Sequence, residues 1–549
     1  MLVPRDAVTL EIHWQRLIAI MDEVDLATVR TSFSTIVGES RDFACIMTDT
    51  KGASLCQSSL SPPNFCVVLP RTSRHLLARF QIDTLQDGDV LVTNDPWLGT
   101  GHLPDYVIMT PVFFHGKVIG FIGTVAHLAD VGGHIGDIEA TDVFTEGMRI
   151  PPSKLYCAGL PNAQLHEMIS ANCRVPDLVL GDLGAIIGTH RVGARYIREF
   201  LDDYSMPDLA ELAGQIHSVS EAAIRQAILA LPDGKWEFGL NIDGYIDQVH
   251  LHATVEVRGS DVFVDYKGTS HQVKHAAINC TFNTTFASTM YPFKCALVPR
   301  LPNNEGIFRP IHVTAPAGSI LNCTEPSAVK ARAKTTNNIN QVLFGALWEI
   351  FGDHAQAGSG SIWPIGVSGT AEGYGLFSVS VLPHGGRGSL KELDGMGPIA
   401  FPHNSAVTPT EVLEMKAPIL IMKKALRLDS AGPGRCRGGL GQVIVIKSIA
   451  SGPVRLRLRP DKLSCAPPGL AGGQQGRLGE VWINGRKIER FPVIQFMPGD
   501  VCELFLPGGA GFGYVNERDP DLVRRDVGCG YVSRLAALEQ YGVRVEGDL

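Results

Sequence analysis

The chain has 549 residues, of which 45% are hydrophobic and only 19% carry a charge. This length predicts two or three domains, and a charged fraction below the roughly 25% of an average soluble protein excludes a disordered chain. The net charge of −8, without a basic run, gives no support for binding to nucleic acid. The 59 glycines and 34 prolines predict many turns and close backbone contacts.

Targeting segments and cysteine pairs are not indicated. Charged residues interrupt the first 24 residues, which differs from a secretory signal, and no uncharged window reaches the 18 or so residues of a membrane span. The twelve cysteines are scattered without a CxxC pair, so neither a zinc ribbon nor a disulfide framework is expected. We therefore expect a cytoplasmic protein with reduced thiols and no membrane partner.

The first half of the chain combines helical and strand patterns. Apolar residues recur at three- and four-residue intervals over residues 8–29, which predicts an opening helix with Thr9 as a candidate cap. Short apolar runs between Gly and Asp turns predict strands. The expected strands are residues 43–47, 90–92, 106–114 and 118–125, and further helices are expected over residues 163–171, 182–202 and 208–231.

The second half is expected to be richer in strands. Residues 249–257 and 261–266 alternate around a Gly-Ser turn and predict a hairpin, and residues 328–351 predict a helix. The glycine-rich residues 358–397 are expected to form loops that line a site. Strands are then expected at 413–428, 441–449, 454–458, 480–483 and 500–506, followed by a short helix at 532–541.

These patterns predict a multidomain α+β fold, with mixed sheets and helices in the first half and a strand-rich C-terminal part. We expect an α/β domain over residues 1–205 that carries a metal site. An α+β domain with the glycine-rich loops is expected over residues 206–410, and a β-rich domain over residues 411–549.

Side chains that bind metals gather in one short part of the chain. Two histidines with one carboxylate are a common ligand set for a divalent ion that activates water. His102 and Asp105 are three residues apart, and a hairpin through His115 and Gly116 would return His127 close to His102. The relevant segments are Asn94-Asp95-Pro96-Trp97, Gly101-His102-Leu103-Pro104-Asp105 and His127-Leu128-Ala129-Asp130-Val131-Gly132-Gly133-His134.

The same pattern also fits a purely structural network. In that interpretation His102, His127 and His134 are loop residues that hydrogen-bond to Asp105, Asp130 and Asp137. The spacing alone does not separate the two interpretations, because the HxxD pair is frequent and no HExxH motif is present.

At this point the sequence resembles the hydantoinase B family, which includes the B-type subunits or domains of ATP-dependent hydantoinases, lactamases and 5-oxoprolinases. Related subunits occur in acetone and acetophenone carboxylases. The resemblance rests on the three segments above and on further blocks in the expected order: residues 302–311, 315–322, 408–414, 429–441, 498–500, 507–513 and 517–520.

The resemblance implies a divalent metal ion, such as Zn, Mn or Fe, with His102, Asp105 and His127 as ligands. Asp130 and Asp95 would then be catalytic residues that orient a ligand or steer a metal-bound water molecule. His134 occupies a position where family members often differ, which leaves the ligand number open.

Two other regions are candidates for binding substrate or an anion. Arg435 and Arg437 lie in a glycine-rich segment that could hold a phosphorylated intermediate, although the pattern favours a turn between strands with exposed arginines. His403 and Asp394 could reach the substrate, and the alternative is that both satisfy ordinary loop polarity.

The resemblance also implies a partner, because the chain contains no GxxxxGK[ST] loop and is too short to include an ATP-binding half. An A-type subunit would bind ATP and phosphorylate a cyclic amide, and the two chains would form an A2B2 heterotetramer. This chain would open the activated ring. The alternative activity is that of a carboxylase subunit; a non-catalytic scaffold would require an empty metal site.

Overall fold

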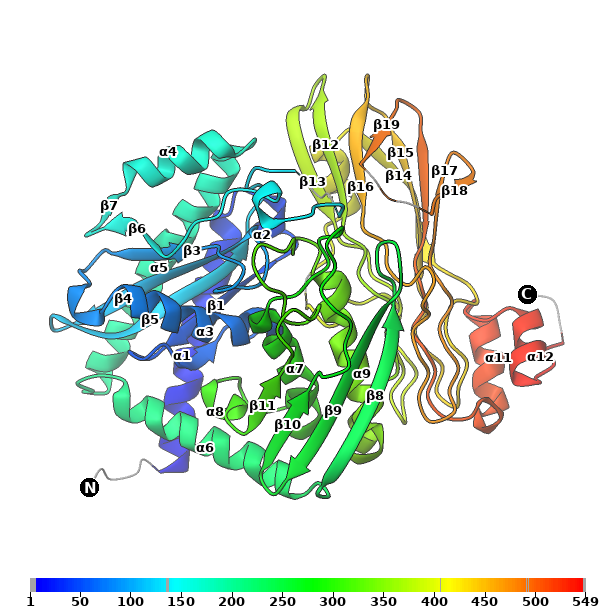
Figure 1. Ribbon diagram of the computed structural model, residues 1–549, viewed down its shortest axis with the longest axis horizontal. Coiled ribbons are helices and arrows are strands. Elements are labelled where there is room, and N and C mark those ends of the chain that lie inside the picture. The colour runs from blue at the N-terminus through cyan, green and yellow to red at the C-terminus, as the bar shows by residue number, and fades with distance from the viewer. Residues whose placement is uncertain (1–5, 135–137, 405, 490, 492, 547–549) are drawn as a thin grey trace.

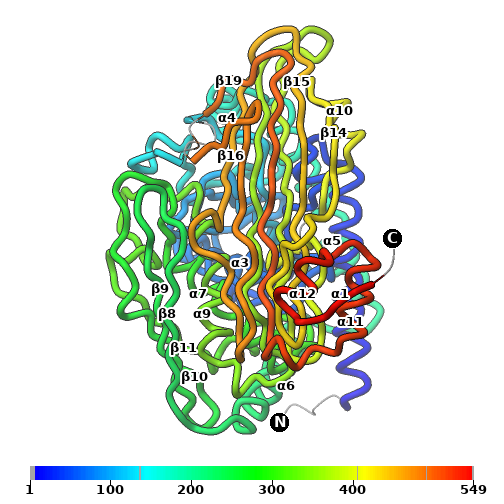
Figure 2. The backbone as a smooth tube through the Cα atoms, turned by 90° about the vertical axis from the view of Figure 1, so that its right-hand side faces the viewer, coloured from blue at the N-terminus to red at the C-terminus, as the bar shows by residue number. Residues whose placement is uncertain are grey.

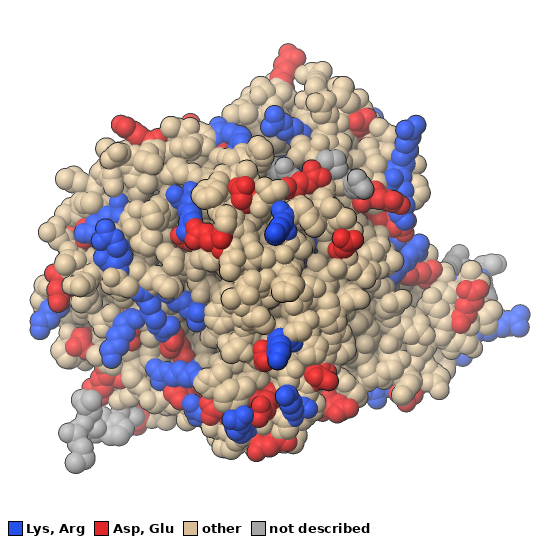
Figure 3. Space-filling view, in the orientation of Figure 1, with Lys and Arg blue, Asp and Glu red and all other residues tan. Residues whose placement is uncertain are grey.

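The computed structural model describes residues 6–134, 138–404, 406–489, 491 and 493–546. These residues form twelve α-helices and four β-sheets, which confirms the α+β class. The N-terminal helices and first sheet lie on one side of the molecule, and the C-terminal strands lie on the other (Figure 1). On the face seen in Figure 3, charges of both signs are interspersed. No helix in this part of the chain is long and apolar enough to cross a membrane.

The first sheet is antiparallel, with strand order β2-β1-β5-β4-β3-β6-β7. Its central hairpin, β4–β5, confirms the predicted pair of strands and turns at His115 and Gly116, both of which have positive φ. The strands are β1 (Phe43–Thr48), β2 (Ser54–Gln57), β3 (Val90–Thr93), β4 (Asp105–Phe114), β5 (Lys117–His127), β6 (Ser153–Cys157) and β7 (Leu160–Pro161).

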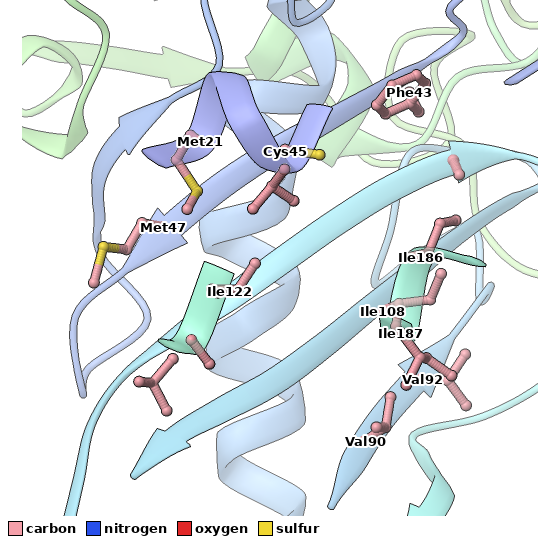
Figure 4. Packing of buried hydrophobic residues seen from close by; sticks show 14 of the residues in the cluster. Met21, Phe43, Cys45, Met47, Val90, Val92, Ile108, Ile122, Ile186 and Ile187 are labelled. Atoms are coloured by element: carbon pink, nitrogen blue, oxygen red, sulfur yellow. The ribbon is translucent and has the colours of Figure 1, made fainter. Parts of the chain in front are cut away.

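Helices cover both faces of this sheet. Side chains alternate along β1, so Phe43, Cys45 and Met47 pack against α1 and α5 (Figure 4), whereas Ala44 and Ile46 contact α3. Burial on both faces explains why these strands are apolar throughout. The helices of this half are α1 (Ala7–Thr31), α2 (Thr35–Gly38), α3 (Pro63–Arg79), α4 (Ala163–Asn172), α5 (Pro176–Asp203) and α6 (Ala210–Leu229).

The expected N-cap of α1 was wrong. Asp6 caps this helix, because its carboxylate accepts hydrogen bonds from the backbone N–H groups of Val8 and Thr9. Thr9 lies within the first turn and donates its hydroxyl proton to the same carboxylate. The helix therefore begins one turn earlier than the position of Thr9 suggested.

His190 on α5 is buried in the hydrophobic core between α5 and the first sheet, and it should make the free energy of unfolding depend on pH. Its two ring nitrogens lie 2.8 Å from the hydroxyls of Thr110 and Thr124, and burial lowers its pKa to about 3. The unfolded chain binds a proton that the folded chain excludes, so the free energy of unfolding falls by up to about 1.4 kcal/mol per pH unit below pH 6.5. We expect His190→Gln to reduce this slope in urea unfolding at pH 7 and pH 5. Equal slopes in both proteins would contradict the assignment.

The second sheet has the order β11-β10-β9-β8 and packs against α7 and α9. The predicted hairpin is confirmed as β9–β10, and the predicted helix 328–351 begins at Ala333, because residues 329–332 form a tight turn before it. The elements are β8 (Gly234–Ile242), β9 (Val249–Arg258), β10 (Asp261–Asp265), β11 (Ile311–Thr314), α7 (Phe282–Leu297), α8 (Glu305–Phe308) and α9 (Ala333–Phe351).

The third and fourth sheets enclose one hydrophobic core, formed among others by Val367, Ile446 and Leu504, and together they are called the sandwich below. Their orders are β13-β12-β16-β19 and β14-β15-β20-β17-β18. The strands are β12 (Ile365–Ala371), β13 (Gly375–Val381), β14 (Ile419–Leu426), β15 (Gln442–Ser448), β16 (Val454–Leu458), β17 (Glu480–Ile483), β18 (Arg486–Lys487), β19 (Ile494–Phe496) and β20 (Val501–Phe505).

Two expectations for this half were wrong. Strands β12 and β13 lie within the segment 358–397, which was expected to form loops. The expected strand 413–428 is divided into α10 (Thr410–Lys416) and β14. The three largest hydrophobic clusters centre on the first sheet, on the second sheet and on the two C-terminal sheets, and each draws residues from distant parts of the chain. The expected domain boundaries near 205 and 410 stay predictions.

The glycine-rich segments pack against one another below the sandwich, where Figure 2 shows long extended traces side by side. Gly509 N donates to Gly439 O at 2.9 Å, and Gly439 N donates to Arg387 O at 2.8 Å. A Cβ atom on Gly439 would lie 1.7 Å from Met396 O, and one on Gly438 would lie 1.9 Å from Gly509 O. These glycines therefore allow backbone to contact backbone, whereas other residues of the segment 358–397, among them Ile362, Gly366 and Ser380, do line a cavity.

Candidate metal centre

The pairing of three strands brings acidic and imidazole side chains to one end of the first sheet. Asp105 at the start of β4 lies directly opposite His127 at the end of β5. The backbone N–H of His127 donates to the carbonyl of Asp42, the residue before β1. Asp42, His127 and Asp105 thus form a row across the adjacent strands β1, β5 and β4.

His102 reaches this row from the loop that precedes β4. Asn94 holds this loop, because its amide donates to Leu103 O at 2.9 Å and its oxygen accepts from Ile150 N at 2.6 Å. Gly101 has φ +89°, and a Cβ there would lie 2.2 Å from Thr284 Oγ1. The loop can therefore approach α7 only with glycine beside His102.

The ligand atoms of His102, Asp105 and His127 all lie within 4.8 Å of one another. Asp105 Oδ1 is 2.8 Å from His102 Nε2 and also 2.8 Å from His127 Nδ1. The other oxygen, Oδ2, accepts from Thr100 Oγ1 at 2.6 Å and from Arg332 Nη2 at 2.9 Å. The structure thus brings the three predicted ligands together and fixes the orientation of the carboxylate between them.

The donor set fits a bound cation. His102 Nδ1 donates to the carbonyl of Lys330 at 3.2 Å, so Nε2 of the neutral ring carries the lone pair. Among the described residues no group donates a hydrogen bond to this buried Nε2, and it faces a carboxylate oxygen at 2.8 Å. Two acceptors at this distance repel each other unless a proton or a metal ion lies between them.

The charges of this cluster favour the ligand forms of two of its members. Burial and the charge of Arg332 lower the pKa of His102 to about 3, so its ring is neutral. Burial alone would raise the pKa of Asp105, but His102, His127 and Arg332 hold it well below its usual range. Burial would also lower the pKa of His127, and the carboxylate of Asp105 outweighs it and raises this pKa.

Asp42 is a member of this site that was not predicted from the sequence. Its Oδ2 lies 4.0 Å from His127 Nδ1, and its side chain is 27% exposed in the cavity wall. Burial raises the pKa of this carboxyl, against the opposing charge of His127. Asp42 can therefore hold a proton next to the candidate ligands.

The two predicted catalytic aspartates are engaged in the surrounding loops. Asp130 lies in the cavity wall and accepts hydrogen bonds from Gly132 N at 3.0 Å, Arg174 N at 2.5 Å and Arg174 Nη1 at 2.9 Å. Asp95 is buried outside the cavity lining and accepts from Trp97 N and from Arg149 Nε. Both carboxylates thus hold loops that surround the site, and their catalytic role stays a prediction.

A cavity of about 230 Å³ lies over the cluster, between the first sheet and the sandwich. His403, one of the predicted substrate residues, lines this cavity, and its Nε2 is 2.7 Å from Asn337 Oδ1. Burial lowers the pKa of His403 to about 4, so the ring is neutral. Four cations also line the cavity and were not predicted: Lys330, Arg332, Arg457 and Arg459.

The other three predicted substrate residues are not part of this cavity. Asp394 accepts from both Nη atoms of Arg518, and Arg437 Nε donates to Asp526 at 3.0 Å. Arg435 donates to Lys391 O and to Glu392. These contacts fasten α11 (Pro520–Gly528) and α12 (Arg534–Tyr541) to the glycine-rich segments. Arg435, Arg437 and Asp394 therefore make structural contacts outside the cavity, and their role in binding an anion or substrate stays a prediction.

This assignment predicts a local effect on stability. Replacing Arg518 by methionine leaves the buried Asp526 and the half-buried Asp394 without their common partner, which should cost about 3–5 kcal/mol. We expect faster hydrogen exchange over residues 520–541 and an unchanged metal content. Arg524→Met, which removes an exposed pair with Asp521, is the control and should leave both unchanged. Loss of metal in Arg518→Met would contradict the structural role.

Among the cavity residues that were not predicted, only the arginines on and next to β16 follow a pattern that is recognisable in the sequence. Arg455, Arg457 and Arg459 alternate with Leu along β16, which indicates a strand with one cationic face. Asp42 and Arg332 had no local signal, because only the sheet order and the turn before α9 bring them to the cluster.

Known proteins are similar to this chain in both sequence and fold. The B-type subunit of a putative D-/L-hydantoinase from Pseudomonas sp. (strain NS671) is 30% identical over 568 residues, covering 98% of this chain and 95% of the relative. The beta subunit of caprolactamase from Pseudomonas jessenii is 26% identical over 580 residues, covering 99% of this chain and 97% of the relative.

Two solved structures have a similar fold. The ATP-dependent caprolactamase from Pseudomonas jessenii superposes with a TM-score of 0.91 at 24% identity, over 99% of this chain and 97% of that chain. Nucleotide-free acetone carboxylase superposes with a TM-score of 0.90 at 17% identity, over 99% of this chain and 80% of that chain. The family model described as Hydantoinase B/oxoprolinase matches residues 6–515. The chain therefore belongs to the hydantoinase B/oxoprolinase family.

Proposed function

We propose that this chain is the metal-binding B-type subunit of an ATP-dependent hydrolase of cyclic amides, such as hydantoins, lactams or 5-oxoproline-like rings. The observation that carries the proposal is the buried, unpartnered Nε2 of His102 facing Asp105 beneath a cavity. The names of the relatives, which are subunits of a hydantoinase and of a caprolactamase, support the substrate class and the presence of a partner chain.

In this proposal His102, Asp105 and His127 hold one divalent ion, which supplies Lewis-acid chemistry when bound. Asp42 accepts a proton from the attacking water, because its carboxylate lies at the edge of the cluster and burial raises its pKa. Arg332 keeps the carboxylate of Asp105 in place through Oδ2. His403, held in the opposite wall by Asn337, orients the ring of the substrate.

In this proposal a partner subunit, and not this chain, binds ATP. The A-type subunit phosphorylates the amide oxygen, which makes the ring carbon electrophilic, and the activated ring then reaches the cavity of this chain. Turnover should require both subunits and ATP. We propose an A2B2 assembly in the cytoplasm, which sedimentation of the purified complex would test by its mass.

The likeness in fold to acetone carboxylase makes a carboxylase subunit the second candidate. Both candidates use the same cluster, and they differ in whether water or a carbon nucleophile attacks. The test is an ATP-consumption screen of the complex over hydantoins, lactams and ketones, with ¹⁴C-labelled bicarbonate present. Ring-opened amino acids without retained label support the hydrolase, whereas label in the product of a ketone supports the carboxylase and overturns the proposal.

A further inference from the structure

Arg457 places a guanidinium in the cavity wall without a bonding partner. Strand pairing sets Arg457 on β16 opposite Gly366 on β12, and a Cβ on this glycine would lie 2.4 Å from Arg457 Nη2. The guanidinium therefore occupies space that any other residue at position 366 would fill. Its Nε is buried, and the hydrogen bonds and ion pairs found among the described residues do not include this guanidinium.

The nearby acidic group does not neutralise Arg457. Both oxygens of Asp130 already accept hydrogen bonds, from Gly132 and from Arg174, and neither oxygen forms an ion pair with Arg457. Burial, followed by the charges of Arg459 and Arg174, lowers the pKa of Arg457 to about 9, so the side chain is still a cation at neutral pH. A half-buried cation with a buried Nε and no ion pair among the described residues costs stability, which requires a compensating role.

Neighbouring groups make this part of the cavity positive and place it beside the metal cluster. Arg459 Nη1 lies 3.4 Å from Lys330 O, and the same carbonyl accepts the hydrogen bond from His102 Nδ1. Helix α9 begins at Ala333 in the cavity wall, and no side chain caps it. Its N-terminal N–H groups thus add to the positive potential of the arginines.

We infer that Arg457 is the anion-binding residue of this cavity and that it takes the phosphoryl group of a phosphorylated substrate. The planar fork of arginine matches two oxygens of a phosphate, and several cations around one point suit a dianion better than a carboxylate. The identity of the anion rests on the proposed function, in which ATP activates the ring. A phosphoryl group held here would place the adjoining carbon close to the His102 cluster.

Binding of inorganic phosphate and of phenyl phosphate to the full-length chain, measured by titration calorimetry, tests this inference without turnover. We expect Arg457→Met to weaken both ligands by about tenfold or more, and Arg457→Lys to give an intermediate loss. Arg455→Met, an exposed arginine two residues away on the same strand, is the matched control and should bind like the wild type. The monoester should bind at least as tightly as free phosphate, since the substrate carries the phosphoryl group.

Four results would overturn the inference. Unchanged phosphate affinity in Arg457→Met would remove the residue from the subsite, and equal competition by acetate would show a site for carboxylates. Loss of phosphate binding by the wild type after treatment with EDTA would place the anion on the metal instead. The thermal midpoint of Arg457→Met should not fall, because an unpartnered cation is removed; a clear fall would indicate a structural arginine. Failure of the proposed function would appear separately, as absent ATP-dependent ring opening with phosphate binding intact.

Discussion

Replacing Asp105 by asparagine is expected to empty the metal site and to abolish ATP-dependent ring opening. The substitution keeps the shape of the side chain but removes the charge shared by His102 and His127. We expect the metal content to fall from about one ion per chain to near zero and turnover to fall by about three orders of magnitude. Metal analysis by mass spectrometry and assays of the assembled complex measure the two effects.

The same substitution should also lower stability by about 3–5 kcal/mol, because the buried Arg332 loses its partner. Asp89→Asn is the matched control. It breaks another buried carboxylate–cation pair of the first sheet, with Lys154, away from the cluster. We expect the control to lose stability and to keep its metal. Full metal occupancy in Asp105→Asn would refute the ligand assignment, whatever the change in stability.

Replacing Gly439 by alanine is expected to prevent the second half of the chain from folding. The added methyl group would lie 1.7 Å from Met396 O and 2.8 Å from Arg387 N, and both neighbours are backbone atoms that cannot rotate away. We expect a loss of more than about 4 kcal/mol, measured by urea unfolding, with mostly insoluble protein on expression. Gly452→Ala is the control.

The control position has open space around it, since no atom lies within 4 Å of a Cβ at Gly452. The free energy of unfolding of Gly452→Ala should therefore remain within about 0.5 kcal/mol of the wild-type value. A folded and stable Gly439→Ala protein would show that the glycine-rich segments can separate without cost to the fold.

The parts that were predictable from sequence are those set by local pattern. The hairpin β4–β5 follows from two apolar runs and a turn, and it carries Asp105 opposite His127. The helix α3 was not predicted, and it contains Pro70, a residue that normally interrupts a helical pattern. Asp42 was missed for a different reason, since β1 reaches β5 through a non-local pairing that no periodicity reports.

Glycine content was the most misleading signal. A glycine marks a close approach of some atom to the backbone, and composition does not reveal whether this atom belongs to a substrate or to another segment of the same chain. The prediction for Arg435 and Arg437 depended on the first alternative. The structure shows the second, because Gly438, beside Arg437, contacts the backbone of Gly509.

The contacts among the glycine-rich segments also have a consequence for how the chain folds. Gly386 N donates to Pro507 O, Ala510 N donates to Gly358 O, and Gly432 N donates to Gly509 O, so this region joins residues that are far apart in sequence. Such long loops must close before any of these bonds form, which slows folding. During synthesis, the carbonyl of Gly358 therefore lacks its partner Ala510 until the ribosome has released the segment around Gly509. This interval is when the nascent chain most needs protection from aggregation.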